Sequence, residues 1–452
     1  MPFTLLRTLA CLSLAVLVHQ SVSGPDAMRV GLALFTLIGG LWMTQALHLS
    51  VTALLVPLLA AGAGLMDLRA ALSAFAHPII FLFLGGFALA AALQQQGLDR
   101  ALARAMLRLA GGRRALAVAL LFGLTALLSM WISNTATAAM VLPMAMGLLG
   151  SSDPAGEGDE IGPRERVFVL LGVAYSASIG GMGTLVGSPP NAIAAAQAGI
   201  GFAEWMRFGI PLVMLLMPLM VGVLYVLLRP RLGGRIGLTA SAPFEWTSAR
   251  RLTLLIFALT TAGWIGAAPL GRALGIAADM DSWVALAAVV ALVASRTLGW
   301  DNIERQTHWG VLLLFGGGLA LSEVMQASGA SGFLATALVG ALQGTPVFWL
   351  VFGVVAFVVF LTELVSNTAS AALLVPILLG VAQAMGLPGA LLAVAIAVSA
   401  SCAFMLPVAT PPNAIVYATD QVPQTTMMRC GFWLNLVCIG AITLATTVWL
   451  AP

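Results

Sequence analysis

Lysine does not occur in this 452-residue chain, and charged residues of all kinds make up only 8% of it. The twenty basic residues are therefore all arginines. Without a lysine amine, the chain can form neither a Walker-type phosphate loop nor a catalytic Schiff base. The arginines form no stripe interleaved with aromatic residues, so we expect no nucleic-acid partner.

Cysteine is nearly as scarce, and its placement argues against two further kinds of site. The four cysteines stand singly in apolar runs, at Cys11, Cys402, Cys430 and Cys438. This spacing fits neither a disulfide framework nor a tetrahedral metal site. We expect the cysteines to serve as small apolar side chains within helices.

Apolar residues dominate the composition, since they account for 60% of the chain and raise its mean hydropathy to +1.03. A helix needs roughly 20 apolar residues to cross a hydrocarbon core ~30 Å thick, and runs of about that length recur throughout the sequence. A soluble domain has a far more polar composition. The sequence therefore predicts an all-α polytopic membrane protein embedded in a lipid bilayer.

The apolar runs and the breakers between them predict eleven transmembrane helices. These spans lie near 5–22, 30–48, 51–66, 77–97, 164–199, 208–228, 251–268, 281–297, 309–327, 390–420 and 431–450. Two further apolar stretches, 115–150 and 346–386, are each interrupted midway by a polar tripeptide. We expect these two stretches to form re-entrant hairpins that enter and leave the membrane on one side.

The placement of arginine predicts the orientation, because basic residues concentrate in cytoplasmic loops. If the N-terminus is cytoplasmic, sixteen of the twenty arginines lie inside. The four that lie outside are Arg29, Arg69, Arg207 and Arg272. The C-terminus then lies outside, in the periplasm of a bacterial inner membrane. The first hairpin opens from the cytoplasm and the second from the exterior.

The first of the predicted helices lies in residues 1–29. Arg7, the apolar run after it and the small residues before Pro25 would also fit a cleaved secretory signal peptide. We favour a retained helix, because the predicted topology counts correctly only if this helix is kept.

Three polar segments separate the apolar runs. Residues 100–114 carry arginines four positions apart, which is typical of an amphipathic helix on the cytoplasmic surface. Residues 151–163, rich in Gly, Pro, Asp and Glu, are expected to form a solvated loop. The segment 229–250 is the predicted cytoplasmic linker between two halves of the chain.

These halves contain the same motifs in the same order. The matching pairs are 85–89 with 317–321, 133–139 with 366–372, and 187–193 with 409–415. We therefore predict a first repeat at 30–228 and a second at 251–452, each with five crossings. An odd number of crossings inverts the second copy, and inverted-topology repeats are typical of secondary transporters.

Asparagine is rare, and four of the six asparagines lie in the repeated motifs, at Asn134, Asn191, Asn367 and Asn413. An amide at membrane depth is costly unless it has a partner. This concentration predicts one polar site built from four segments. Asparagines that merely join helices are the alternative, but that role would not require a proline pair at each of two equivalent positions.

Each Ser-Asn-Thr tripeptide precedes a helix-forming run, and its residues are good N-caps. The tips 133–135 and 366–368 would therefore present N–H groups and the positive end of a helix dipole to a dianion. The arm before each tip ends in unpaired carbonyl groups, with Ser129 or Thr362 one turn back. Such oxygens suit a small cation.

Proline pairs predict a break in two of the spans, because a Pro-Pro pair cannot continue a helix. The broken helices are predicted at 164–199 and 390–420. Each break frees carbonyl groups next to a hydroxyl, that of Ser188 or of Thr410. We expect the asparagine that follows each proline pair to restart the helix.

Charge balance at these motifs predicts coupling to a cation. No arginine or histidine lies within them. A helix end is equivalent to about half a charge, so helix ends alone neutralise a dianion poorly, and bound cations would supply the balance. Glu363, three residues before Ser366, is interpreted as a support for the second tip, with a proton site as the alternative.

At these residues the chain resembles the divalent anion/sodium symporter family, whose members carry four-carbon dicarboxylates, citrate or sulfate. The paired Ser-Asn-Thr tips and the Ser/Thr-Pro-Pro-Asn break after each of them carry the resemblance, which covers nearly the whole chain. It implies a homodimer in which a fixed scaffold domain supports a transport domain that moves as an elevator. It also implies sodium-coupled uptake of succinate, malate or fumarate by alternating access.

The resemblance assigns roles to single residues. The first sodium (Na+) site would use Ser129, Ser133, Asn134 and Gly187. The second would use Thr362, Val365, Asn367 and Ala409. The dicarboxylate would meet Ser133, Asn134, Thr135, Ser188, Ser366, Asn367, Thr368, Thr410 and Pro411.

Other functions stay open at this point. A sodium-independent dicarboxylate exchanger, or a carrier of citrate, sulfate or another divalent anion, would share this architecture. A channel would not need two occluding tips, which favour alternating access. An intramembrane enzyme needs a nucleophile with a base, or paired acids, at depth. The chain offers no such pair at matching spacing, so we predict that it is not an enzyme.

Overall fold

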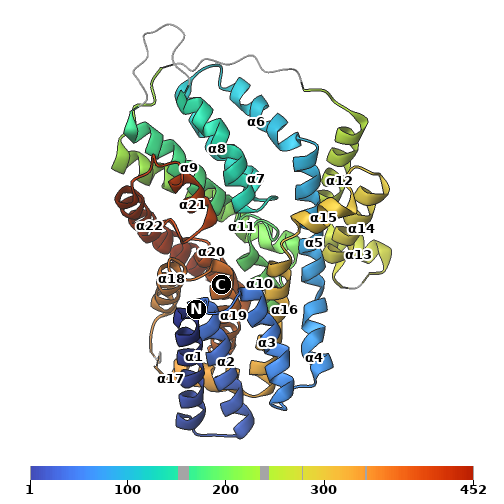
Figure 1. Ribbon diagram of the computed structural model, residues 1–452, viewed down its shortest axis with the longest axis vertical. Coiled ribbons are helices and arrows are strands. Elements are labelled where there is room, and N and C mark those ends of the chain that lie inside the picture. The colour runs from blue at the N-terminus through green and yellow to red at the C-terminus, as the bar shows by residue number, and fades with distance from the viewer. Residues whose placement is uncertain (1, 151–161, 235–243, 277, 342–343, 451–452) are drawn as a thin grey trace.

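The computed structural model describes residues 2–150, 162–234, 244–276, 278–341 and 344–450, and the regular elements in these ranges are all helices (Figure 1). This confirms the predicted all-helical class. The predicted loop 151–163 lies almost wholly outside the described residues. The central part of the predicted linker 229–250 lies outside them as well.

The first part of the chain forms eleven α-helices and a short 3₁₀ turn, η1 (Ala74–Ala76). The helices are α1 (Pro2–Ser21), α2 (Asp26–Thr44), α3 (Leu49–Gly62), α4 (Leu68–Ser73), α5 (Pro78–Gln95), α6 (Leu98–Leu109), α7 (Arg114–Ser129), α8 (Asn134–Gly150), α9 (Pro163–Gly180), α10 (Pro189–Ala198) and α11 (Phe202–Leu228).

A second series of helices follows the predicted linker. It comprises α12 (Ser248–Ile265), α13 (Ala267–Leu274), α14 (Met280–Ala294), α15 (Trp300–Gln306), α16 (Trp309–Ala327), α17 (Ala330–Ala341), α18 (Val347–Thr362), α19 (Asn367–Ala384), α20 (Gly389–Ala400), α21 (Pro411–Tyr417) and α22 (Gln424–Leu450).

Several of these helices are long and apolar enough to cross a membrane. By length and composition there are seven among the described residues, or eight if the bent pair α12 and α13 forms one span. Shorter apolar helices such as α3, α7 and α18 accompany them. The protein is therefore a multi-span helical membrane protein, and the count of eleven crossings stays a prediction.

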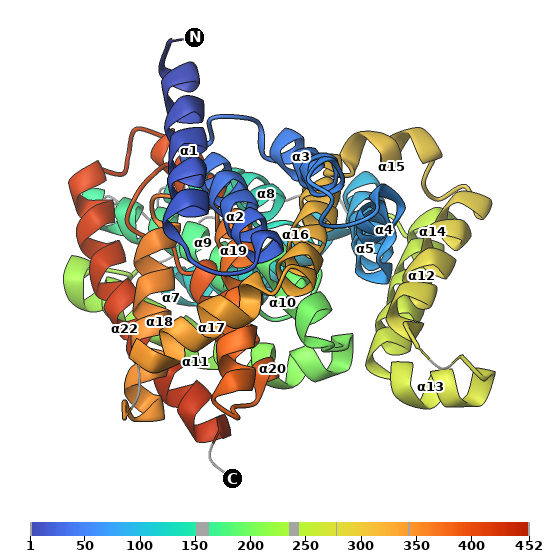
Figure 2. The same cartoon turned by 90° about the horizontal axis from the view of Figure 1, so that it is seen from below.

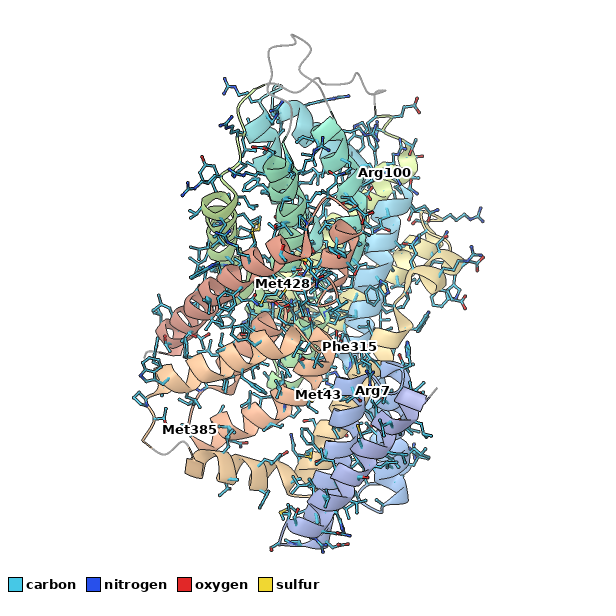
Figure 3. All side chains as sticks on the ribbon, turned by 60° about the vertical axis from the view of Figure 1, so that its left-hand side comes forward. Arg7, Met43, Arg100, Phe315, Met385 and Met428 are labelled. Carbon is cyan, nitrogen blue, oxygen red and sulfur yellow. The ribbon has the colours of Figure 1, made fainter. Side chains whose placement is uncertain are left out.

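Four short helices lie outside the predicted spans. Helix α13 leaves α12 at an angle of 87°, where a single span at 251–268 was expected. Helices α4, α15 and α17 fill segments that were read as connections. Hydropathy reports how apolar a segment is and not its direction, so neither the bend nor the short helices could be read from it. The helix expected over 100–114 is α6, and Figure 3 shows its residue Arg100 far from the central Phe315.

Helices of the two series pack against one another in matched pairs. Helix α5 packs on α14, and α16 packs on α3. Helix α10 contacts α19 and α20, while α21 contacts α8 and α9. These exchanged contacts bring α8, α10, α19 and α21, which begin at the repeated motifs, to the middle of the molecule. Seen from below, α1 projects from one side and α22 ends at the other (Figure 2).

Candidate functional site

Two pairs of helices meet at the Ser-Asn-Thr tripeptides. Helix α7 ends at Ser129 and α8 begins at Asn134. The N–H of Ala136 donates to Ser133 Oγ (3.3 Å), as expected of an N-cap. Helices α18 and α19 repeat the arrangement, with the second tripeptide at the turn between them. At each tip a helix therefore begins directly after the turn, with its N-terminal end at the tip.

The helices with proline pairs are broken, as the sequence indicated. Helix α9 ends at Gly180 and α10 begins at Pro189, after the N-cap Ser188. In the second break the N-cap is Thr410, whose hydroxyl accepts the N–H of Asn413 (3.5 Å). The expectation that asparagine restarts each helix was wrong. Proline restarts it, because the first helical position needs no N–H donor.

Two of the four motif asparagines brace the breaks and do not face a cavity. The side chain of Asn191 donates to the carbonyls of Gly181 and Thr184, both at 2.8 Å. Asn413 donates in the same way to Ala403 (3.1 Å) and Leu406 (3.0 Å). Both asparagines are fully buried. Of the four asparagines predicted to form one polar site, Asn134 and Asn367 therefore remain as candidates.

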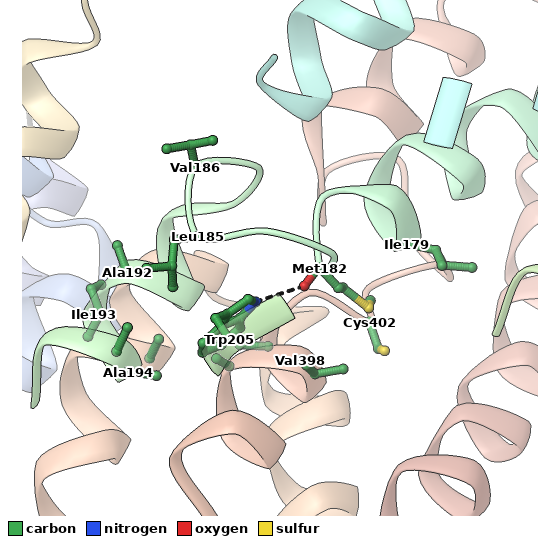
Figure 4. Close-up of a cluster of buried hydrophobic side chains, with 14 of the residues drawn as sticks. Ile179, Met182, Leu185, Val186, Ala192, Ile193, Ala194, Trp205, Val398 and Cys402 are labelled. Atoms are coloured by element: carbon green, nitrogen blue, oxygen red, sulfur yellow. Dashed lines mark hydrogen bonds between the residues drawn. The ribbon is translucent and has the colours of Figure 1, made fainter. Parts of the chain in front are cut away.

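The first broken segment is held from a third helix as well. Trp205, near the start of α11, donates its indole N–H to the carbonyl of Met182 (3.0 Å), as the dashed line in Figure 4 shows. Leu185 follows on the same loop, beside Ala192 of α10 (Figure 4). This packing holds the segment between α9 and α10, which lacks helical hydrogen bonds, in one position within the apolar core.

Both tips and both breaks line a single cavity of about 720 Å³. The predicted site residues that line it are Ser133, Asn134, Thr135, Gly187, Ser188, Val365, Ser366, Asn367, Thr368, Ala409, Thr410 and Pro411. Two predicted residues do not reach it. Ser129 and Thr362 are fully buried behind the tips. Residues more than 270 positions apart thus share one polar space.

A cluster of oxygen atoms lies behind the first tip. The Asn134 amide nitrogen lies 2.7 Å from Ser129 Oγ, 3.1 Å from the Ala177 carbonyl oxygen and 3.2 Å from the Gly187 carbonyl oxygen, so its two hydrogens are shared among three acceptors. Ser129 Oγ in turn donates to the Ala177 carbonyl (2.6 Å). The close approach depends on Gly187, since a Cβ there would lie 2.6 Å from the carbonyl oxygen of Gly181.

The second tip has a matching cluster. Thr362 Oγ1 lies 2.7 Å from Asn367 Oδ1 and 2.8 Å from the Ala400 carbonyl. Each cluster therefore joins a hydroxyl from one arm, the amide of the tip and a carbonyl from the end of the broken helix. Hydroxyl, amide and carbonyl oxygens are the hard, neutral ligands that a small cation prefers. The hydroxyl and carbonyl oxygens at both tips, with the amide oxygen of Asn367 at the second, thus fit Na+, and Asn134 would have to turn its amide oxygen toward the ion.

Glu363 adjoins the second tip but is occupied by the broken segment after α20. Its carboxylate accepts the N–H groups of Phe404 (2.7 Å), Met405 (2.9 Å) and Leu406 (3.2 Å). The Asn435 amide adds a fourth donor at 2.7 Å. The side chain is 4% exposed. Since all four partners are donors, the geometry fits a support that accepts hydrogen bonds as a carboxylate.

The lining of the cavity also contains residues that the sequence did not single out. His48 and His308 line it, together with Gln45, Phe83 and Phe87. The sequence places both histidines near the ends of predicted spans and gives them no role. No local motif marks them, and only the packing of α3 against α16 brings them to the cavity.

Replacement of Gly181 by alanine tests the Asn134 position without altering a polar group. A Cβ at Gly181 would lie 2.2 Å from the nearer terminal atom of the Asn134 amide, so the amide must move. We expect Gly181→Ala to fold normally and to bind a ligand of the first tip about tenfold more weakly or worse, as when a hydrogen bond to a charged group is lost. Gly147→Ala, in α8 with open space around it, is the matched control. Equal transport by both variants would contradict the assignment.

Comparison with known proteins gives consistent results. Residues 40–399 match the family model described as "Citrate transporter". The chain is 49% identical to an uncharacterized transporter of Haemophilus influenzae, over 93% of this chain and 92% of that protein. It is 38% identical to an uncharacterized transporter of Methanocaldococcus jannaschii, over 94% and 95%.

A further relative is named for what it carries. The chain is 31% identical to the sodium-dependent dicarboxylate transporter SdcS of Staphylococcus saprophyticus, over 97% of this chain and 89% of that protein. Among solved structures, the YdaH transporter of Alcanivorax borkumensis matches with a TM-score of 0.59 and 16% identity, over 84% of this chain and 86% of that one. At that identity the match shows a shared fold alone.

Proposed function

Because the chain belongs to the family of citrate transporters and divalent anion/sodium symporters, we infer that it imports four-carbon dicarboxylates together with Na+. It is a multi-span membrane transporter and not an enzyme. Succinate, malate and fumarate are the substrates we propose. One observation carries the proposal, namely that both Ser-Asn-Thr tips line one cavity and that no arginine is among its described lining residues.

The electrostatics of that cavity support a cation-coupled dianion. The N-terminal ends of α8 and α19 supply only about half a positive charge each. The carboxylate of Glu363 adds negative charge nearby, although four donors offset it. A dicarboxylate therefore needs added positive charge to stay bound, and the oxygen clusters behind the tips lie close enough to supply it through Na+.

Each cluster shares an asparagine with the tip that it supports. Ser129, Ser133, Asn134 and Gly187 would bind one Na+. Thr362, Val365, Asn367 and Ala409 would bind another. The substrate carboxylates would then meet the tip residues on the cavity side, with Ser188, Thr410 and Pro411 beside them. Ion and anion would thus bind to opposite faces of the same two turns.

The wider architecture follows the same proposal. We expect a homodimer in a bacterial inner membrane, with the N-terminus in the cytoplasm and the C-terminus in the periplasm. The two inverted repeats would supply the scaffold and transport domains of an elevator that gives the cavity alternating access.

Citrate is the second candidate substrate, because the matching family model is described as a citrate transporter. A cavity of about 720 Å³ has room for a six-carbon anion. Sulfate carriage and sodium-independent exchange remain the alternatives with this architecture. Competition of unlabelled citrate and sulfate against labelled succinate in proteoliposomes separates these substrates.

Removal of sodium should abolish both uptake and tight substrate binding. Without Na+, the carbonyl oxygens around each tip and a nearby carboxylate repel one another, so the tips are loose. We expect calorimetric titration with succinate to give an affinity at least about fivefold lower in choline than in sodium, the lower end of an ordinary coupling. Uptake should rise with an inside-negative potential if three or more Na+ accompany each dianion. Equal affinity in the two salts would point to the exchanger.

A further inference from the structure

The cavity that the tips line also carries two imidazole side chains. His48 is the N-cap of α3 and His308 is the N-cap of α16. Both line the cavity that contains the two Ser-Asn-Thr tips. Neither histidine lies in a repeated motif, although α16 carries the motif 317–321 beyond His308, so the two rings add a polar part of the lining that is separate from the tips.

Packing holds the two histidines on one wall. Ser50 of α3 donates its hydroxyl to the Gly310 carbonyl of α16 (3.3 Å). The Cε1 atom of His48 lies 3.9 Å from the position that a Cβ of Gly310 would take. His308 packs edge-to-face on Phe87, with ring centroids 5.3 Å apart. The starts of α3 and α16 are therefore joined, and both rings lie beside the junction.

The hydrogen bonding of His48 leaves a donor for a ligand. Its Nδ1 accepts the N–H of Ser50 (3.3 Å), so in the neutral ring the proton is on Nε2. His308 makes no side-chain bond to cap its helix. Two helix N-termini and two imidazoles thus face one space. The carboxylate among the described lining residues, Glu363, accepts four donors of its own.

The corresponding positions of the other half line a different cavity. His77, the N-cap of α5, precedes His308 by 231 residues, and Asp279, the N-cap of α14, follows His48 by the same interval. Both line a second cavity of about 710 Å³, together with Arg272 and Asp281. One cavity therefore has two imidazoles where the other has one imidazole and a carboxylate, a difference that favours anions in the first.

We propose that His48 and His308 form a second anion subsite, which holds the substrate after it leaves the tips and before it leaves the cavity. The proposal rests on the inferred function, since it takes the transported dianion as its ligand. A cavity of about 720 Å³ is of the size that holds drug-like ligands, so it has room for a small dianion at the tips or at the imidazoles in turn. The subsite affects anion exchange only on the side of the membrane to which this cavity opens.

Asparagine variants test the subsite while keeping the helix caps. Asparagine is a strong N-cap, so His48→Asn keeps the bond to Ser50 and removes the imidazole. His308→Asn is its partner, and His77→Asn, in the second cavity, is the matched control. Exchange of labelled succinate is measured in proteoliposomes of uniform protein orientation, with the anion varied on one face at a time.

We expect His48→Asn and His308→Asn to raise the half-saturating succinate concentration about three- to tenfold on one and the same face. His77→Asn should leave the value on that face unchanged. The subsite is overturned if the half-saturating concentration is unchanged when both histidines are replaced by asparagine, or if it shifts equally on both faces.

The same experiment distinguishes a wrong substrate proposal from a wrong subsite proposal. If the unmodified protein exchanges citrate or sulfate but not succinate, the dicarboxylate proposal fails alone, and the same variants are measured with the anion that is carried. An unmodified protein that exchanges none of these anions overturns both proposals.

Discussion

Succinate uptake should fall below about a tenth of the wild-type rate when either Asn134 or Asn367 is replaced by alanine. Asn134→Ala removes the amide nitrogen that lies within 3.2 Å of three acceptor oxygens, on Ser129, Ala177 and Gly187. A buried polar group that loses its partner costs about 1–3 kcal/mol, and here the loss also removes a proposed ligand of the anion. Uptake of labelled succinate by proteoliposomes in a sodium gradient measures the effect.

Asn302→Ala is the matched control for these two variants. Asn302 lies in α15, outside the cavity, and its one side-chain hydrogen bond in the described structure is to the exposed Gln95 (3.3 Å). The control should transport at nearly the wild-type rate, and all three variants should elute from size exclusion as the wild-type protein does. If Asn134→Ala or Asn367→Ala is folded and transports normally, the tips do not bind the substrate.

Much of this site can be predicted from the sequence because polar residues are so rare in it. A Ser-Asn-Thr turn inside an apolar run has few explanations other than the end of a helix, and the structure ends α7 at Ser129 and α18 at Thr362. A proline pair inside a span likewise marks a break. These signals are local, so one sequence is enough to find them.

The roles of identical residues could not be predicted in the same way. Asn134 and Asn191 are both motif asparagines, yet one lines the cavity and the other binds the carbonyls of Gly181 and Thr184. The difference depends on which carbonyl groups the break directs inward. His48 and His308 are 260 positions apart and lie in no motif, so only the packed helices reveal them.

Asymmetry between the halves was also hidden by the repeated motifs. In the alignment that pairs the two tips, Glu363 corresponds to Met130. The first half thus holds its broken segment without a carboxylate, through Asn191, Trp205 and the bond from Thr184 to the Met130 carbonyl. The second half adds a buried charge at the equivalent place, which makes its broken segment more dependent on one side chain.

Glu363→Leu should therefore lose uptake and also unfold at a lower temperature than the wild-type protein. The substitution leaves the N–H groups of Phe404, Met405 and Leu406 and the Asn435 amide without their acceptor. Each hydrogen bond to a charged group contributes about 1.5–3 kcal/mol. The segment these bonds hold leads to Ala409 and Thr410 in the cavity wall. Thermal unfolding in detergent and succinate uptake measure the two effects, and Met130→Leu is the matched control in the other half.

Glu363→Gln distinguishes a support from a proton site. The glutamine oxygen can still accept from Phe404, Met405 and Asn435, while its NH2 group faces the Leu406 N–H and loses that bond. A support should then lose about one hydrogen bond's worth of stability, about 1–3 kcal/mol, and keep measurable uptake with the wild-type dependence on pH. A proton site cannot be replaced by an amide, so its loss would flatten the pH profile. A flattened profile in a folded Glu363→Gln protein would overturn the positioning role, because a side chain that only holds the chain from Phe404 to Leu406 has no proton to exchange.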